Sequence, residues 1–328
     1  MTRCLVNGEL REAPGSFPVI NPSTGEVFAV APHADAGMVD DAVEAAAAAF
    51  PAWAATPIEE RRAMMTKALD ILQAHEAELA ELLVKEQGKP LAMAIGECGM
   101  CWDQMRKTLD TELPVEVYSE DADFKTIAVR KPIGPVACIT PWNFPMFTAI
   151  QKWCPSITWG NTVVHKPSPY TPLTGQRVAE LIADVFPKGV FNFVAGADKE
   201  GHNVGTHLVN SKQIRKVSFT GSVNTGKAIM AASANDVKRV TLELGGNDPA
   251  IIRGDVDVAQ VAPEGEYSPH ALVLPLRRLR APLVLPHADW MRCHHPSSLL
   301  CSVFWGLLQH GADLLRNQAH VRPRVHLR

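Results

Sequence analysis

The chain has 328 residues, enough for about two domains of ordinary size and a substantial hydrophobic core. Hydrophobic residues make up 46% and charged residues 20% of the sequence, which excludes a disordered, collagenous or coiled-coil protein. The formal net charge of −3 indicates neither a nucleic acid nor an anionic membrane as a partner.

The N-terminal residues lack the apolar core of a secretory signal. The longest apolar stretch, residues 299–308, is far shorter than the roughly 20 residues that a membrane span needs. Seven cysteines, an odd number spread over the chain, do not suggest a disulfide framework. We therefore expect a cytoplasmic protein with reduced thiols.

The first 90 residues hold two predicted helical stretches. Residues 36–49 and 58–86 are rich in Ala, Leu and Glu at helical spacing. The second stretch ends before Gly-Lys-Pro at residues 88–90, a sequence typical of a helix stop followed by a new start. We predict that a helical hairpin opens the chain.

Cys98 and Cys101 have CxxC spacing within a helical segment, but no second cysteine pair accompanies them. The arrangement favours two packed thiols over a zinc or redox site. The Cys-His-His run at residues 293–295 lies in a stretch of unusual composition. We predict no metal site.

From residue 126 onward, short β-branched runs alternate with helical stretches. The predicted strands are residues 126–129, 136–140, 162–166, 190–194, 217–220, 240–243 and 250–252. The predicted helices are residues 173–185, 202–209 and 226–232. This alternation predicts an α/β fold with an open, mostly parallel, Rossmann-like sheet, flanking helices, and a ligand beyond the carboxyl ends of the strands.

Two motifs follow the first strands of this predicted sheet. Residues 139–145 read ITPWNFP, in which two prolines restrict the backbone around Asn143, whose amide can donate to a developing oxyanion. Ordinary turn and packing roles are the alternative. Residues 163–168 form an apolar strand that ends in Lys166, a cation suited to a ribose or a phosphate, or simply to a solvated strand end.

Two further motifs lie beyond residue 216. Residues 217–227, VSFTGSVNTGK, predict a strand, a tight Gly-Ser turn and a helix whose N-terminus faces an anion, with Ser222 as an ordinary N-cap in the alternative reading. The run is neither GxGxxG nor GxxxxGK[ST]. Residues 240–249, VTLELGGNDP, place Glu243 in an apolar run, where a buried carboxylate suits a general base; a salt-bridged strand end is the alternative.

The order and spacing of these motifs resemble the aldehyde dehydrogenase superfamily, from about residue 6 to residue 257. The runs NPSTGEVFAV, AFPAW, ERR and EQGKP, which begin at residues 21, 49, 60 and 86, resemble the same family. The resemblance implies an oxidoreductase that oxidises a small-molecule aldehyde to a carboxylic acid, with NAD or NADP as its cofactor.

The resemblance also implies residue roles. Trp142, Ser222 and the helix after Gly226 would line the cofactor pyrophosphate, and Lys166 would bond the adenosine ribose. The other cofactor-binding residues would be Ile139, Thr140, Pro141, Gly201, Gly205, Phe219, Thr220, Gly221 and Leu244. Asn143 and Glu243 would be the catalytic residues, the first in the oxyanion hole and the second as the base that activates water.

Two departures from the family pattern are visible. Members that prefer NAD often carry a carboxylate three residues after the lysine, and Pro169 stands there, so the choice between NAD and NADP stays open. The family's nucleophilic Cys lies in a Gly-Gln-x-Cys run about three dozen residues beyond the base, near Arg277 in this chain. No such run occurs, and Cys293 and Cys301 have unrelated contexts.

The composition changes abruptly near residue 260. From residue 261 onward there is no Lys and no Ile, and this part holds 8 of the 32 basic but only 4 of the 35 acidic residues. Prolines and arginines interrupt the apolar runs of residues 271–286, and only residues 298–315 predict an amphipathic helix. Such local conflicts argue that natural selection has not shaped this part of the chain to adopt one fold. They indicate a frame shift, a mis-joined exon or a pseudogene product.

We therefore predict an aldehyde dehydrogenase-like NAD(P)-binding domain at residues 1–257 and an aberrant tail at residues 258–328, with the catalytic domain largely missing. Members of the family form homo-oligomers, but this chain is not expected to assemble normally. The alternative function is a noncatalytic NAD(P)-binding pseudoenzyme.

Overall fold

The computed structural model describes residues 2–197 and 203–246. Contacts divide the chain into two units, residues 1–243 with 295–328 and residues 244–294, and only residues 244–246 of the second unit are described. The predicted strand at residues 250–252, the predicted helix at residues 298–315 and the tail from residue 258 lie outside the described residues.

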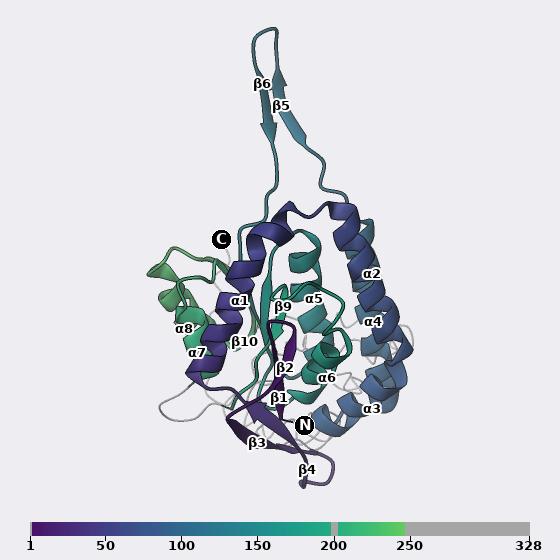
Figure 1. Cartoon of the computed structure of the whole chain (residues 1–328). Helices are drawn as coiled ribbons and strands as arrows, with labels where there is room; N and C mark the ends of the chain where they lie inside the picture. The colour runs from purple at the N-terminus through teal and green to yellow at the C-terminus, as the bar shows by residue number, and fades with distance from the viewer. Residues whose placement is uncertain (1, 198–202, 247–328) are drawn as a thin grey trace, which may run out of the picture. The chain divides into compact units, whose positions relative to one another are not determined.

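A seven-stranded sheet forms the centre of the first unit (Figure 1). Its order is β11 (Arg239–Leu244), β10 (Lys216–Gly221), β7 (Val136–Ile139), β8 (Val163–Lys166), β9 (Phe191–Phe193), β1 (Arg3–Val6) and β2 (Glu9–Glu12). Strands β10, β7, β8 and β9 are parallel, whereas β1 is antiparallel to both β9 and β2. The prediction of an open, mostly parallel α/β sheet is confirmed.

Helices cover both faces of the sheet (Figure 1). On one face lie α1 (Ala36–Ala55), α7 (Val204–Asn210) and α8 (Val223–Ala234). On the other lie α2 (Ile58–Ala74), α3 (Glu76–Gln87), α4 (Leu91–Asp110), α5 (Pro145–Thr158) and α6 (Leu173–Leu181), with α5 and α6 against the strands. Successive β7 residues alternate between the two cores, since Val136 and Cys138 join one and Ala137 and Ile139 the other.

The N-terminal region differs from the predicted helical hairpin. Four strands precede the first helix: β1 and β2 join the sheet edge, and β3 (Gly15–Ile20) pairs antiparallel with β4 (Val27–His33). The stretch 58–86, predicted as one helix, is divided at His75, whose Nδ1 lies 2.8 Å from the carbonyl oxygen of Ile71. This contact occupies a carbonyl at the end of α2, where the helix itself provides no partner.

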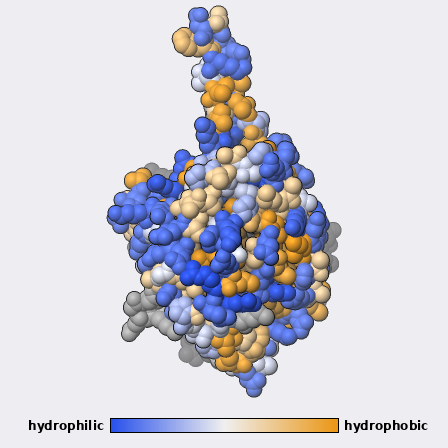
Figure 2. Space-filling model, in the orientation of Figure 1, coloured by the Kyte–Doolittle hydropathy of each residue, from blue (hydrophilic) through white to orange (hydrophobic). Residues whose placement is uncertain are grey.

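Residues 126–129 were predicted as part of the parallel sheet, and this was wrong. The observed strand β6 (Lys125–Ala128) pairs with β5 (Glu116–Glu120) in an antiparallel hairpin of its own, which extends away from the sheet (Figure 1). Figure 2 shows apolar residues along this hairpin below its tip. Val117 and Ile127, which face each other across the two strands, are 51% and 47% exposed, so β6 has no buried core to join.

Candidate active site

The carboxyl ends of three parallel strands bring three predicted site residues into line. Phe219 of β10 pairs in register with Ile139 of β7, and Ile139 pairs in register with Lys166 of β8. Phe219, Ile139 and Lys166 are 5%, 7% and 6% exposed. Parallel strands end at one edge of a sheet, and ligands of open α/β sheets bind beyond that edge. Phe219, Ile139 and Lys166 therefore lie side by side at the edge where a ligand is expected, and their roles in binding stay a prediction.

Lys166 is a buried cation and not a solvated strand end. Its side chain runs beside α7: a Cβ atom added to Gly205 would lie 3.8 Å from Lys166 Cε. The backbone N–H of Thr140 donates to the carbonyl oxygen of Lys166 at 3.2 Å, which continues the strand pairing into the loop after β7. The solvated alternative was wrong because α7 covers the lysine stem.

The turn from β10 into α8 has the predicted strand-turn-helix form. Ser222 is the N-cap, and its Oγ accepts a hydrogen bond of 3.2 Å from the Thr225 N–H. A Cβ atom at Gly221 would lie 2.5 Å from Cζ of the Phe219 ring, so the close packing of this turn requires glycine. Ser222 is exposed, which leaves the N-terminal end of α8 open to a ligand.

The loop between β7 and α5 carries Trp142 and Asn143, both of them exposed. Asn143 Oδ1 accepts a hydrogen bond of 3.1 Å from the Phe144 N–H. Because its oxygen is oriented by this contact, the Asn143 amide presents its NH2 group as a donor, as an oxyanion site requires.

Lys152 of α5 is a further candidate site residue, which the sequence interpretation did not name. It is 6% exposed, and its Nζ donates a hydrogen bond of 2.7 Å to Thr220 Oγ1 at the end of β10. Burial lowers the pKa of Lys152, and the charge of Glu243 acts in the opposite direction. A lysine among the buried apolar residues of α5 was the available signal, since a buried cation is rare without a function.

Glu243 was expected to be buried, and this was wrong for the described chain. It is exposed near the end of β11, an edge strand whose burial is only partial. Its electrostatic interaction with Lys152 nevertheless connects it to the same end of the sheet.

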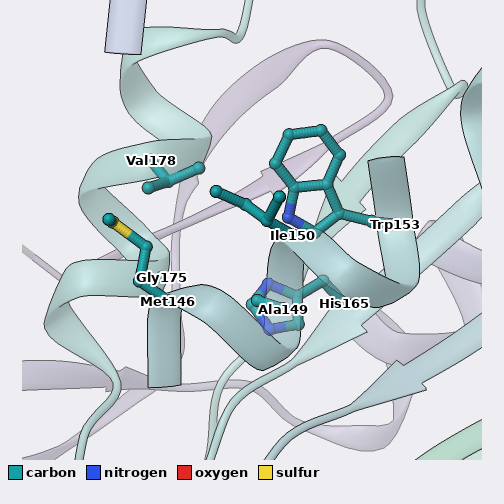
Figure 3. A pocket seen from close by; sticks show the side chains of 7 residues that line it. All are labelled: Met146, Ala149, Ile150, Trp153, His165, Gly175 and Val178. Carbon is teal, nitrogen blue, oxygen red and sulfur yellow. The ribbon is translucent and has the colours of Figure 1, made fainter. Parts of the chain in front are cut away.

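A narrow cavity next to the site has no room for a water molecule (Figure 3). Trp153 of α5 and His165 of β8 both border it, and neither Trp153 Nε1 nor His165 Nδ1 has a hydrogen-bond partner among the described residues. The other ring nitrogen of His165 lies 3.2 Å from Thr140 Oγ1. Burial, with the charges of Lys166 and Lys152, lowers the pKa of His165 to about 3, so the ring is neutral at physiological pH.

The remaining predicted residues are placed as follows. Thr140 is buried, Pro141, Gly205, Thr220 and Gly221 are half-buried, Leu244 is exposed at the end of β11, and Gly201 lies outside the described residues. Across residues 2–197 and 203–246, no group of three or more His, Cys, Asp or Glu side chains is arranged to hold a metal ion. Within the same ranges, no helix is both long and apolar enough to cross a membrane.

The five described cysteines are free and buried, which confirms that Cys98 and Cys101 are packed thiols of α4. Burial raises the pKa of Cys4 to about 11 and that of Cys138 to about 12. The pKa values of the other described thiols are raised by burial as well. Since the thiolate is the nucleophile, none of these cysteines is activated for attack at neutral pH.

Residues 10–267 match the model of a protein family described as the aldehyde dehydrogenase family. The chain belongs to this family. It is similar to the Escherichia coli K12 succinate-semialdehyde dehydrogenase [NADP(+)] GabD, with 36% identity over 78% of this chain and 54% of that protein. It is 38% identical to a glutarate-semialdehyde dehydrogenase of Pseudomonas aeruginosa over 74% of this chain and 50% of that protein.

Solved aldehyde dehydrogenases share the fold. An NAD+ complex of an aldehyde dehydrogenase from Bacillus cereus has a TM-score of 0.76 at 36% identity, and covers 81% of this chain and 55% of that chain. The chain thus spans about half the length of the curated relatives that it matches.

Proposed function

We propose that this chain binds NAD+ or NADP+ at the carboxyl edge of its parallel sheet. The in-register alignment of Phe219, Ile139 and Lys166 carries the proposal, because it places a buried cation at the same sheet edge as the end of β10, the strand that leads into the open N-terminus of α8. Lys166 bonds the adenosine ribose, and the turn at Ser222 receives the pyrophosphate. The predicted residue set, including Gly201 and Leu244, is retained as part of this proposed site.

The described side chains fit such a cofactor. A side chain at Gly205 would enter the space beside the Lys166 stem. The absence of a side chain at Gly221 lets the turn after β10 pack closely against the Phe219 ring. Trp142, 40% exposed, has ring surface that a bound cofactor could cover. These features support the proposal of a Rossmann-like dinucleotide site within residues 1–257.

The reaction proposed for the complete site is oxidation of a small aldehyde to a carboxylic acid, for which NAD+ or NADP+, held by the residues named above, would supply the hydride acceptor. Asn143 donates its amide hydrogen bond to the aldehyde oxygen as negative charge develops there. Glu243 takes the proton of the attacking water, and the Lys152 ammonium balances its charge.

This chain is proposed to bind the cofactor without sustained turnover. No Gly-Gln-x-Cys run occurs in its sequence, and the described thiols are buried. Without a positioned thiolate, Asn143 and Glu243 have no covalent intermediate to act on. The proposed state is thus a cofactor-binding pseudoenzyme within an oxidoreductase family.

The residues do not decide between NAD and NADP, because Pro169 offers no carboxylate to the ribose hydroxyls.

The free state of the five described cysteines supports a reducing, cytoplasmic compartment.

Calorimetric titration of the full chain with NAD+ and with NADP+ tests this function. Lys166→Ala is expected to weaken binding by about 1–3 kcal/mol through loss of a charge-assisted hydrogen bond. Lys188→Ala is the matched control, because Lys188 is exposed and pairs with Glu9, away from the site. A folded wild-type chain that binds neither cofactor would refute the proposal.

A further inference from the structure

Lys89 and Glu97 form a buried ion pair underneath the loop that carries Asn143. Lys89 lies between α3 and α4, and Glu97 is in the second turn of α4. Their side chains are 3% and 0% exposed, and Lys89 Nζ donates to Glu97 Oε2. Neither the cofactor residues nor the proposed catalytic residues include this pair.

The two charged groups form hydrogen bonds with the backbone at the two ends of one turn, residues 143–147. Lys89 Nζ donates a hydrogen bond of 3.0 Å to the backbone carbonyl of Asn143 and lies 4.4 Å from the centre of the Phe144 ring. Glu97 Oε1 accepts hydrogen bonds of 3.0 Å from the backbone N–H groups of Met146 and Phe147. The pair therefore fixes the backbone from the Asn143 carbonyl to the first turn of α5.

Stability alone gives a weak reason to keep such a pair, because a buried ion pair is often no more stabilising than apolar residues of similar volume. The hydrogen bonds of the pair instead favour one orientation of the backbone that they contact, because each hydrogen bond has a required geometry. The Glu97 carboxylate also occupies the N-terminal end of α5, where backbone N–H groups have no partner within the helix.

We propose that Lys89 and Glu97 are positioning residues that hold the Trp142–Asn143 turn in the geometry needed to bind cofactor and to present the Asn143 amide. This inference rests on the proposed function, because the site is the one assigned to NAD(P). The proposed role requires no contact between the ion pair and the cofactor or the aldehyde, because the pair acts through the backbone of residues 143–147. Loss of either charge lets the turn sample other conformations, which lowers the fraction of molecules ready to bind.

The order of the turn can be measured directly. In the full chain labelled with 5-fluorotryptophan, the Trp142 fluorine resonance is assigned by its loss in Trp142→Phe. A single narrow resonance is expected for the wild type, and a broadened or split one for both Lys89→Met and Glu97→Gln. The Trp53 resonance, from a buried ring bonded to the Ile157 carbonyl, is expected to stay unchanged and reports that the fold is intact.

Glu86→Gln is the matched control. Glu86 is also a buried carboxylate, 3% exposed, and accepts hydrogen bonds from the backbone N–H groups of Leu173 and Thr174 at the start of α6. It makes the same kind of contact as Glu97, but at a different helix. Its variant is expected to lose stability without any change in the Trp142 resonance.

Titration with NAD+ and NADP+ completes the test. Lys89→Met and Glu97→Gln are each expected to weaken binding by about tenfold, the effect of losing one hydrogen bond to a charged group, whereas Glu86→Gln is expected to bind like the wild type. An unchanged Trp142 resonance in both pair variants, unchanged affinity, or equal effects of Glu86→Gln would overturn the proposal.

The two proposals fail in different ways. If the wild-type chain binds neither cofactor, the proposed function is wrong, and the positioning of the turn is then decided by the Trp142 resonance alone.

Discussion

Lys152 Nζ and Thr220 Oγ1 are joined by a hydrogen bond of 2.7 Å between the middle of α5 and the end of β10. The two residues are 68 positions apart in the sequence, and the ammonium is almost completely buried. The contact connects the helix after the Trp142 loop to the strand before the Ser222 turn. The contact therefore links the two elements that flank the loops of the proposed cofactor site.

Thr220→Val is expected to destabilise the chain by about 1–3 kcal/mol, because it removes the hydroxyl acceptor and leaves the Lys152 ammonium buried without it. Lys152→Met removes the buried charge itself and is expected to be neutral or stabilising. The double variant should resemble Lys152→Met. Urea denaturation measures all three, and a Lys152→Met variant as unstable as Thr220→Val would contradict this account.

Gly221→Ala is expected to destabilise the chain by about 1–3 kcal/mol and to weaken cofactor binding, because its methyl group would displace the Phe219 ring. Gly99→Ala in α4 is the control, since nothing lies within 4 Å of the added atom. There the change should stabilise the chain by about 0.5–1 kcal/mol. Thermal unfolding and calorimetric titration check both variants, and equal effects at the two glycines would show that the close contact is unimportant.

The stability of the chain is expected to fall as the pH is lowered from about 6.5 toward 3, in part because of His165. Burial lowers the pKa of the folded-state ring from 6.5 to about 3, so in this window the unfolded chain binds a proton that the folded chain does not. His165→Gln keeps a polar group near Thr140 but does not titrate. The variant should lose less stability than the wild type over this range in urea denaturation; parallel curves would exclude His165 as a source of the pH dependence.

Purified chain is expected to show no NAD(P)-linked oxidation with a panel of aldehydes, including succinate semialdehyde and glutarate semialdehyde. An oxyanion donor such as Asn143 is worth roughly 10²–10³ in rate, but it stabilises an intermediate that requires a positioned thiolate. Cofactor reduction is followed by absorbance. Turnover that disappears in Cys293→Ala or Cys301→Ala would show that one of these thiols supplies the nucleophile.

The β5–β6 hairpin is expected to promote self-association, because it combines exposed apolar side chains with outer strand edges that pair with no other described strand. The double change Val117→Lys with Ile127→Glu replaces a facing apolar pair by opposite charges and leaves the net charge unchanged. Light scattering should show less association for this variant. Equal scattering would place the association elsewhere on the chain.

The sequence identified the parallel strands because each is a short, continuous apolar run bounded by turn residues. Residues 136–140 and 162–166 were predicted, and β7 and β8 occupy Val136–Ile139 and Val163–Lys166. The strands before α1 were missed because runs such as the exposed ELRE of β2 have no apolar alternation. The place of β1 in the sheet is set by a distant partner, β9.

The candidate site also contains residues that a local sequence pattern indicates and contacts that depend on distant parts of the chain. Lys166 ends a strand and Ser222 follows one directly, so local pattern was sufficient to propose both. The pairing of Lys89 with Asn143 spans 54 residues, and that of Glu97 with Met146 spans 49, so no local pattern reveals either contact. Only the packing of α4 against α5 brings these groups together.

The position of β1 between β9 and β2 also determines when the sheet can be completed. The Asn7 N–H donates to Asn192 Oδ1 at 2.9 Å, a contact between residues 185 positions apart, and β1 pairs with β9 in the same region. At a synthesis rate of about 5–20 residues per second, the N-terminal strands wait roughly 10–40 s for that partner to leave the ribosome. During this interval the apolar residues of β1 have no sheet to cover them, which makes the nascent chain a natural client for chaperones.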